Sequence, residues 1–179
     1  MATRPTIERI ETERLLLRLF RESDLDAYAE MCGDPEVMKY LGGTTMSRAD
    51  AWRNMAIILG HWQLRGFGLW AVELRESGQF VGRVGCWRPE GWPGVELAWS
   101  LGRRFWGNGY ATEAARTALD VAFTHLGQSH VISMIHRENE ASIRVAGRLG
   151  MRREGSAELL GHPVVVYGIR RGARGAGKH

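Results

Sequence analysis

The chain has 179 residues, of which 44% are hydrophobic and 25% are charged, and its formal net charge is +4. This length and composition are typical of one globular domain that buries its own core. No stretch approaches the roughly 20 consecutive apolar residues that a membrane-spanning helix needs, so we expect no membrane partner.

The N-terminus and the cysteines indicate a reducing compartment. Charges interrupt MATRPTIERIETERLLLRLF throughout, so this segment lacks the apolar block of a secretion signal. Cys32 and Cys86 have neither the spacing of metal ligands nor that of a disulfide framework. We therefore predict a cytoplasmic protein with two small buried thiols and no metal site.

We expect a single domain over residues 1–170 and a disordered basic tail over residues 171–179. The tail mixes glycine with basic residues and has nothing apolar to bury. One short basic tail without an aromatic or zinc framework is weak support for nucleic-acid binding, so we expect no nucleic-acid partner.

Along the chain, strand and helix patterns alternate without repeats. RLLLRLF (14–20) predicts a first strand, and Ser23 is a good N-cap for a short helix that ends near Gly33. Ser47 caps a longer helical pattern over 47–66, with Asp50 three residues further on as in a capping box. Two helices therefore precede the main run of strands.

The remaining elements complete an α/β (α+β) pattern. Two β-type runs joined at ESGQ predict an antiparallel hairpin. After it the predicted elements are a strand over 94–101, a helix over 110–126, a strand over 130–138, a helix over 139–151, and strands over 152–160 and 163–171. The predicted order is β, α, α, β, β, β, α, β, α, β, β.

The connection RRFWGNG (103–109) is the most informative segment. Asn-Gly usually closes a hairpin, but here a helix follows, so the turn leads into a helix N-terminus. The first backbone N–H groups there lack intrahelical partners and carry partial positive charge. Gly107 and Gly109 have no side chains to keep a phosphate away, and Arg103 or Arg104 adds positive charge. The segment predicts a phosphate site; the alternative is that the glycines only form a tight bend.

Two common phosphate motifs do not fit this segment. A Walker P-loop needs G-x-x-x-x-G-K-[ST], which is absent. A Rossmann fingerprint needs a third glycine where Thr112 stands and an acidic residue about 20 positions later.

The segment RFWGNG (104–109) instead matches the [RQ]-x-x-G-x-[GA] pyrophosphate loop of the GNAT acyltransferases. IETERLLLR, DPEVMKYLGG, GVELAWSL, GYATEA, NEASIRVAGRLGM and VVVYGI resemble, in order, the branch that includes ribosomal-protein N-terminal acetyltransferases. The resemblance covers roughly residues 8–170. It implies a mixed, mostly antiparallel sheet of about seven strands, splayed at its centre and flanked by about four helices, with acetyl-CoA in the opening.

The resemblance also implies which residues contact acetyl-CoA. They lie at the end of one strand, in the loop and in the first turn of the next helix: Trp99, Ser100, Leu101, Arg104, Phe105, Trp106, Gly107, Asn108, Gly109, Tyr110, Ala111 and Thr112. The amides of the pantetheine arm can pair with a strand edge as an added strand does. The alternative for Thr112 is an exposed helix position.

A second cofactor contact is predicted at the start of the last helix. Asn139 and Ser142 are three residues apart and share a helix face. In similar proteins an asparagine here binds the pantetheine arm, although Asn139 can equally be only an N-cap.

Transfer of an acyl group from a thioester to an amine needs a neutral amine and stabilisation of the charge that develops on the carbonyl oxygen. Glu96 is the candidate base, because strand alternation puts it on one face with Ala98 and Ser100. Burial beside apolar neighbours raises a carboxyl pKa toward that task. The alternative is a glutamate that faces solvent.

One position departs from the pattern of many GNAT enzymes. They carry a tyrosine seven residues after the asparagine, which protonates the departing thiolate, and here that position is Ala146. Ser142, or a water that it binds, is the candidate substitute. Neither cysteine lies in a segment that suggests an acyl-enzyme, so we predict direct transfer in a ternary complex.

The acceptor is less well defined by the sequence. We expect an amine-bearing acceptor, either a peptide or protein N-terminus or a small molecule, near some of Tyr40, Trp52, Trp62, Trp87, Trp92 and His162. Two functional classes are left open: an N-acetyltransferase and a non-catalytic module that binds acetyl-CoA. The resemblance also allows a homodimer, which nothing in the sequence itself indicates.

Overall fold

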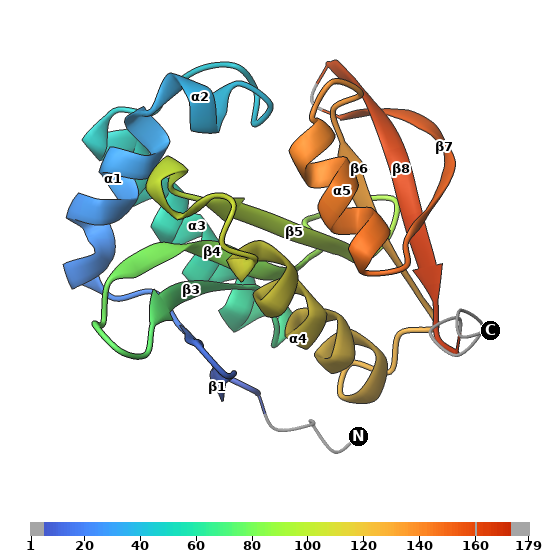
Figure 1. Ribbon diagram of the computed structural model, residues 1–179, viewed down its shortest axis with the longest axis horizontal. Helices are drawn as coiled ribbons and strands as arrows, with labels where there is room; N and C mark the ends of the chain where they lie inside the picture. The colour runs from blue at the N-terminus through green and yellow to red at the C-terminus, as the bar shows by residue number, and fades with distance from the viewer. Residues whose placement is uncertain (1–5, 160, 173–179) are drawn as a thin grey trace.

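One sheet of eight strands runs through the molecule in the order β1-β2-β3-β4-β5-β6-β8-β7 (Figure 1). The computed structural model describes residues 6–159 and 161–172. The strands are β1 (Arg9–Glu11), β2 (Leu15–Arg18), β3 (Leu69–Leu74), β4 (Phe80–Trp87), β5 (Glu96–Leu101), β6 (His130–Ile135), β7 (Arg152–Leu159) and β8 (His162–Arg170). Only β5 and β6 are parallel neighbours in this described sheet. The predicted mixed, mostly antiparallel sheet is confirmed.

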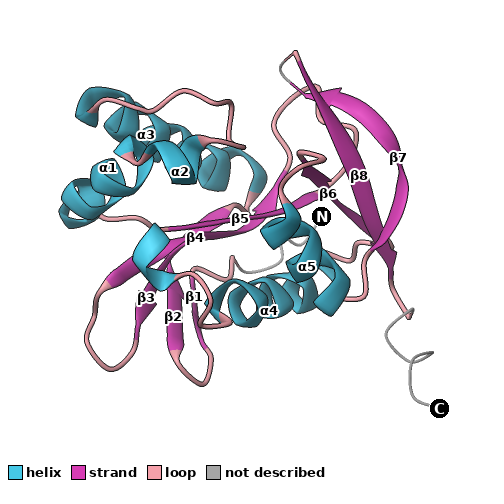
Figure 2. Cartoon of the chain, turned by 45° about the horizontal axis from the view of Figure 1, so that its top comes forward, coloured by secondary structure: helices cyan, strands magenta, loops and turns pink. Residues whose placement is uncertain are grey.

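Helices cover both faces of the sheet. They are α1 (Leu25–Gly33), α2 (Pro35–Met38), α3 (Arg48–Arg65), α4 (Tyr110–Thr124) and α5 (Glu140–Arg148). Figure 2 shows α1, α2 and α3 together on one side of β4 and β5, with α4 on the other side. Side chains of β4 agree, since Arg83 donates to Asn54 of α3 while the Cys86 thiol donates to the Ala118 carbonyl of α4. None of the helices within the described ranges is long and apolar enough to cross a membrane.

Two short elements were not predicted, which accounts for the difference from seven strands and four helices. Strand β1 has three residues and is not fully buried, so its hydrophobic alternation is too short to recognise. Helix α2 is a single turn in which Asp34 accepts a hydrogen bond from the Glu36 amide and Pro35 occupies the first turn.

Of the two serine N-caps predicted for α1 and α3, one is confirmed and the other is wrong. Ser47 caps α3 as predicted, because its hydroxyl accepts a hydrogen bond from the Asp50 amide at 3.1 Å. The prediction of Ser23 as the cap of α1 is wrong, since Ser23 lies inside a 3-10 turn and Asp24 is the N-cap. The Asp24 carboxylate is drawn to the buried Arg18 guanidinium, with which it makes two hydrogen bonds of 2.7 and 2.8 Å.

The core and the end of the chain agree in part with the sequence. Cys32 and Cys86 are both buried free thiols, as predicted. Arg171, which the sequence assigned to the tail, donates from its backbone amide to the Ser129 carbonyl at 2.9 Å and from its side chain to Phe123. Residues 173–179 of the predicted tail lie outside the described residues.

Strands β5 and β6 separate almost as soon as they meet. Their register contains one pair, Glu96 with Ile132, and Ile132 donates its amide to the Val95 carbonyl at 3.0 Å. One step further on, the Ser133 hydroxyl rather than a backbone amide donates to the Leu97 carbonyl at 2.6 Å. Beyond this point no register pairing joins the two strands in the described chain, and the second half of β5 has an open edge.

Candidate active site

A cavity of about 500 Å³ lies beside the open edge of β5. Its walls come from the end of β5, the loop into α4, the first turn of α4, one face of α5, and the segment around α2. Twelve of the predicted cofactor residues line it: Trp99, Ser100, Leu101, Phe105, Trp106, Gly107, Gly109, Tyr110, Ala111, Thr112, Asn139 and Ser142. The fold therefore brings together most of the predicted site.

The N-terminus of α4 opens onto this cavity. Gly109 is its N-cap with φ of 80°, and the first intrahelical bond runs from the Glu113 amide to the Gly109 carbonyl at 3.0 Å. The amides of Tyr110, Ala111 and Thr112 therefore have no intrahelical acceptor. Gly107 has φ of 78° and no atom within 4 Å of the place where a Cβ would stand. The left-handed backbone explains both glycines, and amides without an intrahelical acceptor are suited to bind an anion.

Two buried hydroxyl groups in the cavity wall have no protein partner. The Oγ atom of Ser100 and the Oγ1 atom of Thr112 are buried and make no hydrogen bond to any described residue. Both residues line the cavity. Buried polar atoms are nearly always hydrogen-bonded, so these two fit a ligand that carries oxygen or amide groups along the cavity. The exposed position considered for Thr112 is wrong.

The open edge of β5 also carries unused backbone groups. The carbonyls of Val95 and Leu97 face β6, and the Leu101 carbonyl accepts a hydrogen bond from the Trp106 indole at 2.8 Å. Backbone groups alternate between the two sides of a strand, so Trp99 directs its N–H and C=O to the same open edge. These two groups can pair with the amides of an extended ligand.

The first turn of α5 orients Ser142. Asn139 is the N-cap of α5, and its side-chain oxygen accepts a hydrogen bond from the Ser142 amide at 3.1 Å. The Ser142 hydroxyl accepts a hydrogen bond from the Trp99 indole at 3.2 Å, which leaves its own proton available to donate. Ala146 is fully buried and does not line the cavity.

Glu96 lies at the closed end of β5 and is 7% exposed. Its two oxygens accept hydrogen bonds from the Trp92 indole at 2.7 Å and from the Met134 amide at 3.3 Å. Burial raises the pKa of Glu96, although these two hydrogen bonds act in the opposite direction. The solvent-facing alternative is therefore wrong. Glu96 is not part of the cavity lining.

Two other predicted site residues also lie outside the cavity lining, Arg104 and Asn108. The Arg104 guanidinium stacks over the Phe105 ring at 4.8 Å. The neighbouring Arg103, also considered as a phosphate contact, forms an ion pair with Asp34 at 3.1 Å. Asn108 turns its amide group back to the loop carbonyls.

The sequence reasoning missed the charged residues in the cavity wall. The cationic ones are Lys39 beside α2 and Arg144 and Arg148 on α5. The two arginines are four residues apart and lie on the same helix face as Ala141 and Val145, which also line the cavity. This spacing was visible in the sequence, but it became meaningful only once α5 was known to border the cavity.

The aromatic residues considered for the acceptor have diverse positions. Tyr40 lines the cavity and stacks on His136 with ring centroids 5.0 Å apart. Trp92 hydrogen-bonds Glu96. The other four do not line the cavity. Trp62 lies in the core and Trp87 stacks on His61. Trp52 is exposed on α3, and His162 is the first residue of β8.

Known proteins share this fold and sequence pattern. A family model described as an acetyltransferase (GNAT) domain matches residues 14–152. The chain is 32% identical over 168 residues to the uncharacterized protein YkkB of Bacillus subtilis, covering 89% of this chain and 94% of YkkB. The crystal structure of an acetyltransferase from Agrobacterium tumefaciens has a TM-score of 0.82 and 29% identity, covering 92% of this chain and 95% of that one.

A more distant solved structure shares the fold. It is RimL, a ribosomal L7/L12 α-N-protein acetyltransferase in complex with coenzyme A, with a TM-score of 0.74 and 20% identity, covering 91% of this chain and 98% of RimL. The splayed sheet and its cavity thus define an acyltransferase fold. The family match is more specific: the chain belongs to the GNAT family and is an acetyl-CoA-dependent acetyltransferase.

Proposed function

We propose that this enzyme moves an acetyl group from acetyl-CoA, bound in the cavity beside β5, to a primary amine by direct transfer in a ternary complex. The amides at the N-terminus of α4 would hold the diphosphate. The Trp99 backbone, Asn139 and Ser142 would hold the pantetheine arm.

One observation carries this proposal: two unpartnered buried hydroxyls, Ser100 and Thr112, line the same cavity as the unpaired amides of α4. Coenzyme A carries phosphate oxygens and a chain of amides, which is the chemistry that these groups lack. The donor set therefore fits the cofactor that the family uses.

Bound acetyl-CoA supplies an acetyl group already activated as a thioester. Glu96 is the base in this proposal, and its raised pKa suits it to take a proton from the acceptor amine. Since the carboxyl group lies outside the cavity lining, the proton reaches it through water. The Ser142 hydroxyl, oriented by the Trp99 indole, would donate a hydrogen bond to the departing sulfur, and the thiolate would take its proton from water as free CoA leaves.

Direct transfer is favoured over a covalent acyl-enzyme. Burial raises the pKa of Cys86 to about 12 and also raises the pKa of Cys32. Neither thiol is therefore ionised near neutral pH, and neither lines the cavity. The thioester carbon is left to the acceptor amine itself.

The acceptor class in this proposal is an α-amine of a peptide or protein, or a small-molecule amine. An α-amine has a pKa of about 7.7 to 8.0 and is partly neutral at physiological pH, whereas a lysine at about 10.4 is almost fully charged. A cytoplasmic location stays a prediction from the sequence, and a homodimer stays an expectation from the family resemblance.

The test combines binding with turnover. Calorimetry measures binding of acetyl-CoA, and a thiol reagent follows release of free CoA with a panel of peptides, amino acids and small amines. We expect binding and acceptor-dependent thiol release. Binding without thiol release from any acceptor would support the non-catalytic module instead, and absence of binding would reject both.

A further inference from the structure

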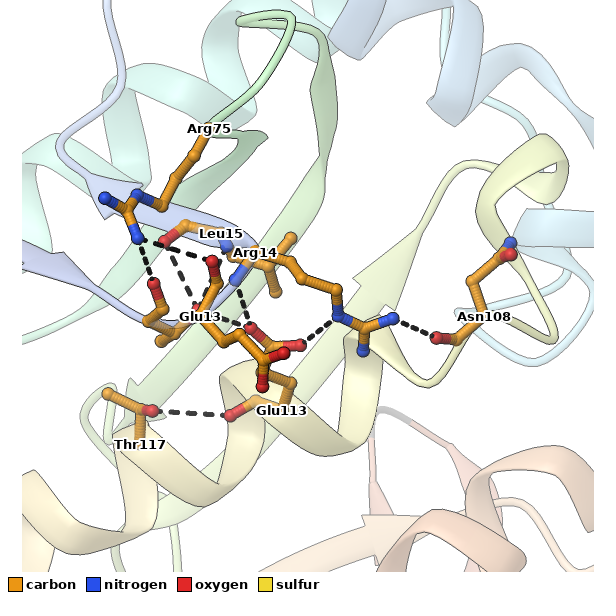
Figure 3. Close-up of polar contacts among 8 residues, drawn as sticks. Glu13, Arg14, Leu15, Arg75, Asn108, Glu113 and Thr117 are labelled. Atoms are coloured by element: carbon orange, nitrogen blue, oxygen red, sulfur yellow. Dashed lines mark hydrogen bonds and ion pairs between the residues drawn. The ribbon is translucent and has the colours of Figure 1, made fainter.

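The loop between β5 and α4 is held by two side chains on the side away from the cavity. The Asn108 side-chain amide donates to the Phe105 and Trp106 carbonyls at 3.2 and 3.0 Å. The Arg14 Nη1 atom donates to the Asn108 carbonyl at 2.9 Å (Figure 3). Neither Arg14 nor Asn108 lines the cavity, whereas Gly107 and Gly109 do.

These contacts fix the direction of two peptide groups. The described chain has no cis peptide bond, and in a trans peptide the N–H points opposite to the C=O. Fixing the Trp106 carbonyl toward Asn108 therefore turns the Gly107 N–H away from Asn108. Fixing the Asn108 carbonyl toward Arg14 likewise turns the Gly109 N–H away from Arg14. Both N–H groups belong to residues of the cavity wall.

Arg14 is itself held in place by the first turn of α4. Its Nε donates to Glu113 Oε2 at 2.7 Å and its backbone amide donates to Glu113 Oε1 at 2.9 Å. The Thr12 hydroxyl donates to the same Oε1 at 2.6 Å. The guanidinium group also lies over the Tyr110 ring, 4.7 Å from its centroid. Figure 3 shows Arg14 bridging Glu113 and Asn108 from the segment before β2.

We propose that Arg14 is a positioning residue for acetyl-CoA, which it never touches: with Asn108, it presets the loop amides that receive the diphosphate. This inference rests on the proposed function. Preset donors cost no reorganisation when the anion arrives, so they raise affinity without any new contact to it.

Arg75 provides a matched control for the substitution of Arg14. Its side chain is 45% exposed, against 44% for Arg14, and carries the same charge. It donates to the carbonyls of Thr12 and Glu13 on the same segment, but it does not contact the loop or α4. Arg75→Met therefore reports the loss of one arginine and of one anchor on this segment, without loss of the loop contact.

The experiment compares Arg14→Met with Arg75→Met in the full chain. Calorimetry gives the Kd of CoA, and NMR titration gives the Kd of pantetheine, which lacks the diphosphate. For Arg14→Met we expect the Kd of CoA to rise by about tenfold, the scale of one lost hydrogen bond of a charged group. The Kd of pantetheine stays within twofold, and Arg75→Met leaves both values near wild type. The kcat at saturating acetyl-CoA also stays near wild type, since Arg14 does not act on the thioester.

Three results overturn this inference while leaving the proposed function intact. They are unchanged CoA affinity in Arg14→Met, an equal loss in Arg75→Met, and an equal loss for pantetheine, which would mean general distortion of the cavity. Wild-type protein that fails to bind CoA rejects the proposed function itself. If Arg14→Met does not fold, Asn108→Ala removes the other loop contact without touching Glu113, and the same selective loss for CoA is expected.

Discussion

The two ends of β5 differ in how their polar groups are satisfied. At the start, Glu96 pairs in register with Ile132 of β6, and both carboxyl oxygens accept hydrogen bonds. At the end, the strand has lost β6, the Trp99 backbone faces an open edge, and the Ser100 hydroxyl has no partner among the described residues.

This difference separates two kinds of chemistry along one strand. The closed end buries a carboxyl group, which raises its pKa toward the range that suits proton transfer. The open end leaves buried donors and acceptors unpaired, which costs folding free energy that a ligand can recover. If the two ends are independent, a substitution that changes catalysis at the closed end should leave CoA binding at the open end unchanged.

The largest expected effect is at the closed end. Glu96→Gln keeps an acceptor for the Trp92 indole but removes the proposed base, so we expect kcat to fall by roughly 10²- to 10⁴-fold. The Kd of acetyl-CoA should stay near wild type, because the open end is unchanged. Steady-state kinetics measures kcat, and calorimetry measures the Kd of acetyl-CoA. A variant with normal kcat would exclude Glu96 as the base.

At the open end, Gly107→Asp should raise the Kd of CoA on the order of 100-fold, since it puts a negative charge beside the diphosphate. The matched control is Gly107→Asn, which has the same shape, tolerates the left-handed backbone and carries no charge. No atom lies within 4 Å of the added Cβ, so both variants should fold. Equal affinity of the two variants would contradict the placement of the diphosphate.

Thr112→Val should have two smaller effects of opposite sign, a gain in the stability of the free protein and a loss of CoA affinity. This change removes an unpartnered buried hydroxyl at nearly constant volume, so the free protein should gain roughly 1 kcal/mol of stability. The same change should weaken CoA binding by about fivefold, because the ligand loses its hydrogen bond. Thermal unfolding and calorimetry measure the two effects; stability that falls together with affinity would argue against an unused hydroxyl.

The smallest effect concerns the pH dependence of stability at the closed end. Burial raises the pKa of Glu96 in the folded protein, whereas the unfolded chain ionises near its ordinary value of about 4.3. The stability that Glu96 provides is therefore complete below that pH and is lost as pH rises through the folded-state pKa. Gln does not titrate, so the Tm of Glu96→Gln relative to wild type should rise from pH 4 and then level off. A difference that shrinks with rising pH would contradict the burial of an ionisable group.

Much of the site was predictable because its signals are local. The loop leading into a helix, the glycines at 107 and 109, the Ser47 cap and the N-cap position of Asn139 each depend on a few neighbouring residues. The Ser23 cap failed because the Asp24 carboxylate is held by Arg18 and by the Arg21 amide, a pattern that N-cap preferences do not include. The ion pair of Arg103 with Asp34, by contrast, joins distant parts of the chain and depends on the tertiary fold.

The sequence by itself determined the family, the order of all the described elements except β1 and α2, and the residues of the loop and first turn of α4 that line the cavity. Only the tertiary structure decided that β5 and β6 part after Glu96, that α5 brings Arg144 and Arg148 to the cavity, and that Arg14 meets Glu113 across 99 positions of the chain. The reason is physical: caps and left-handed glycines are set by backbone geometry within one turn, whereas contacts between distant segments depend on which strands become neighbours.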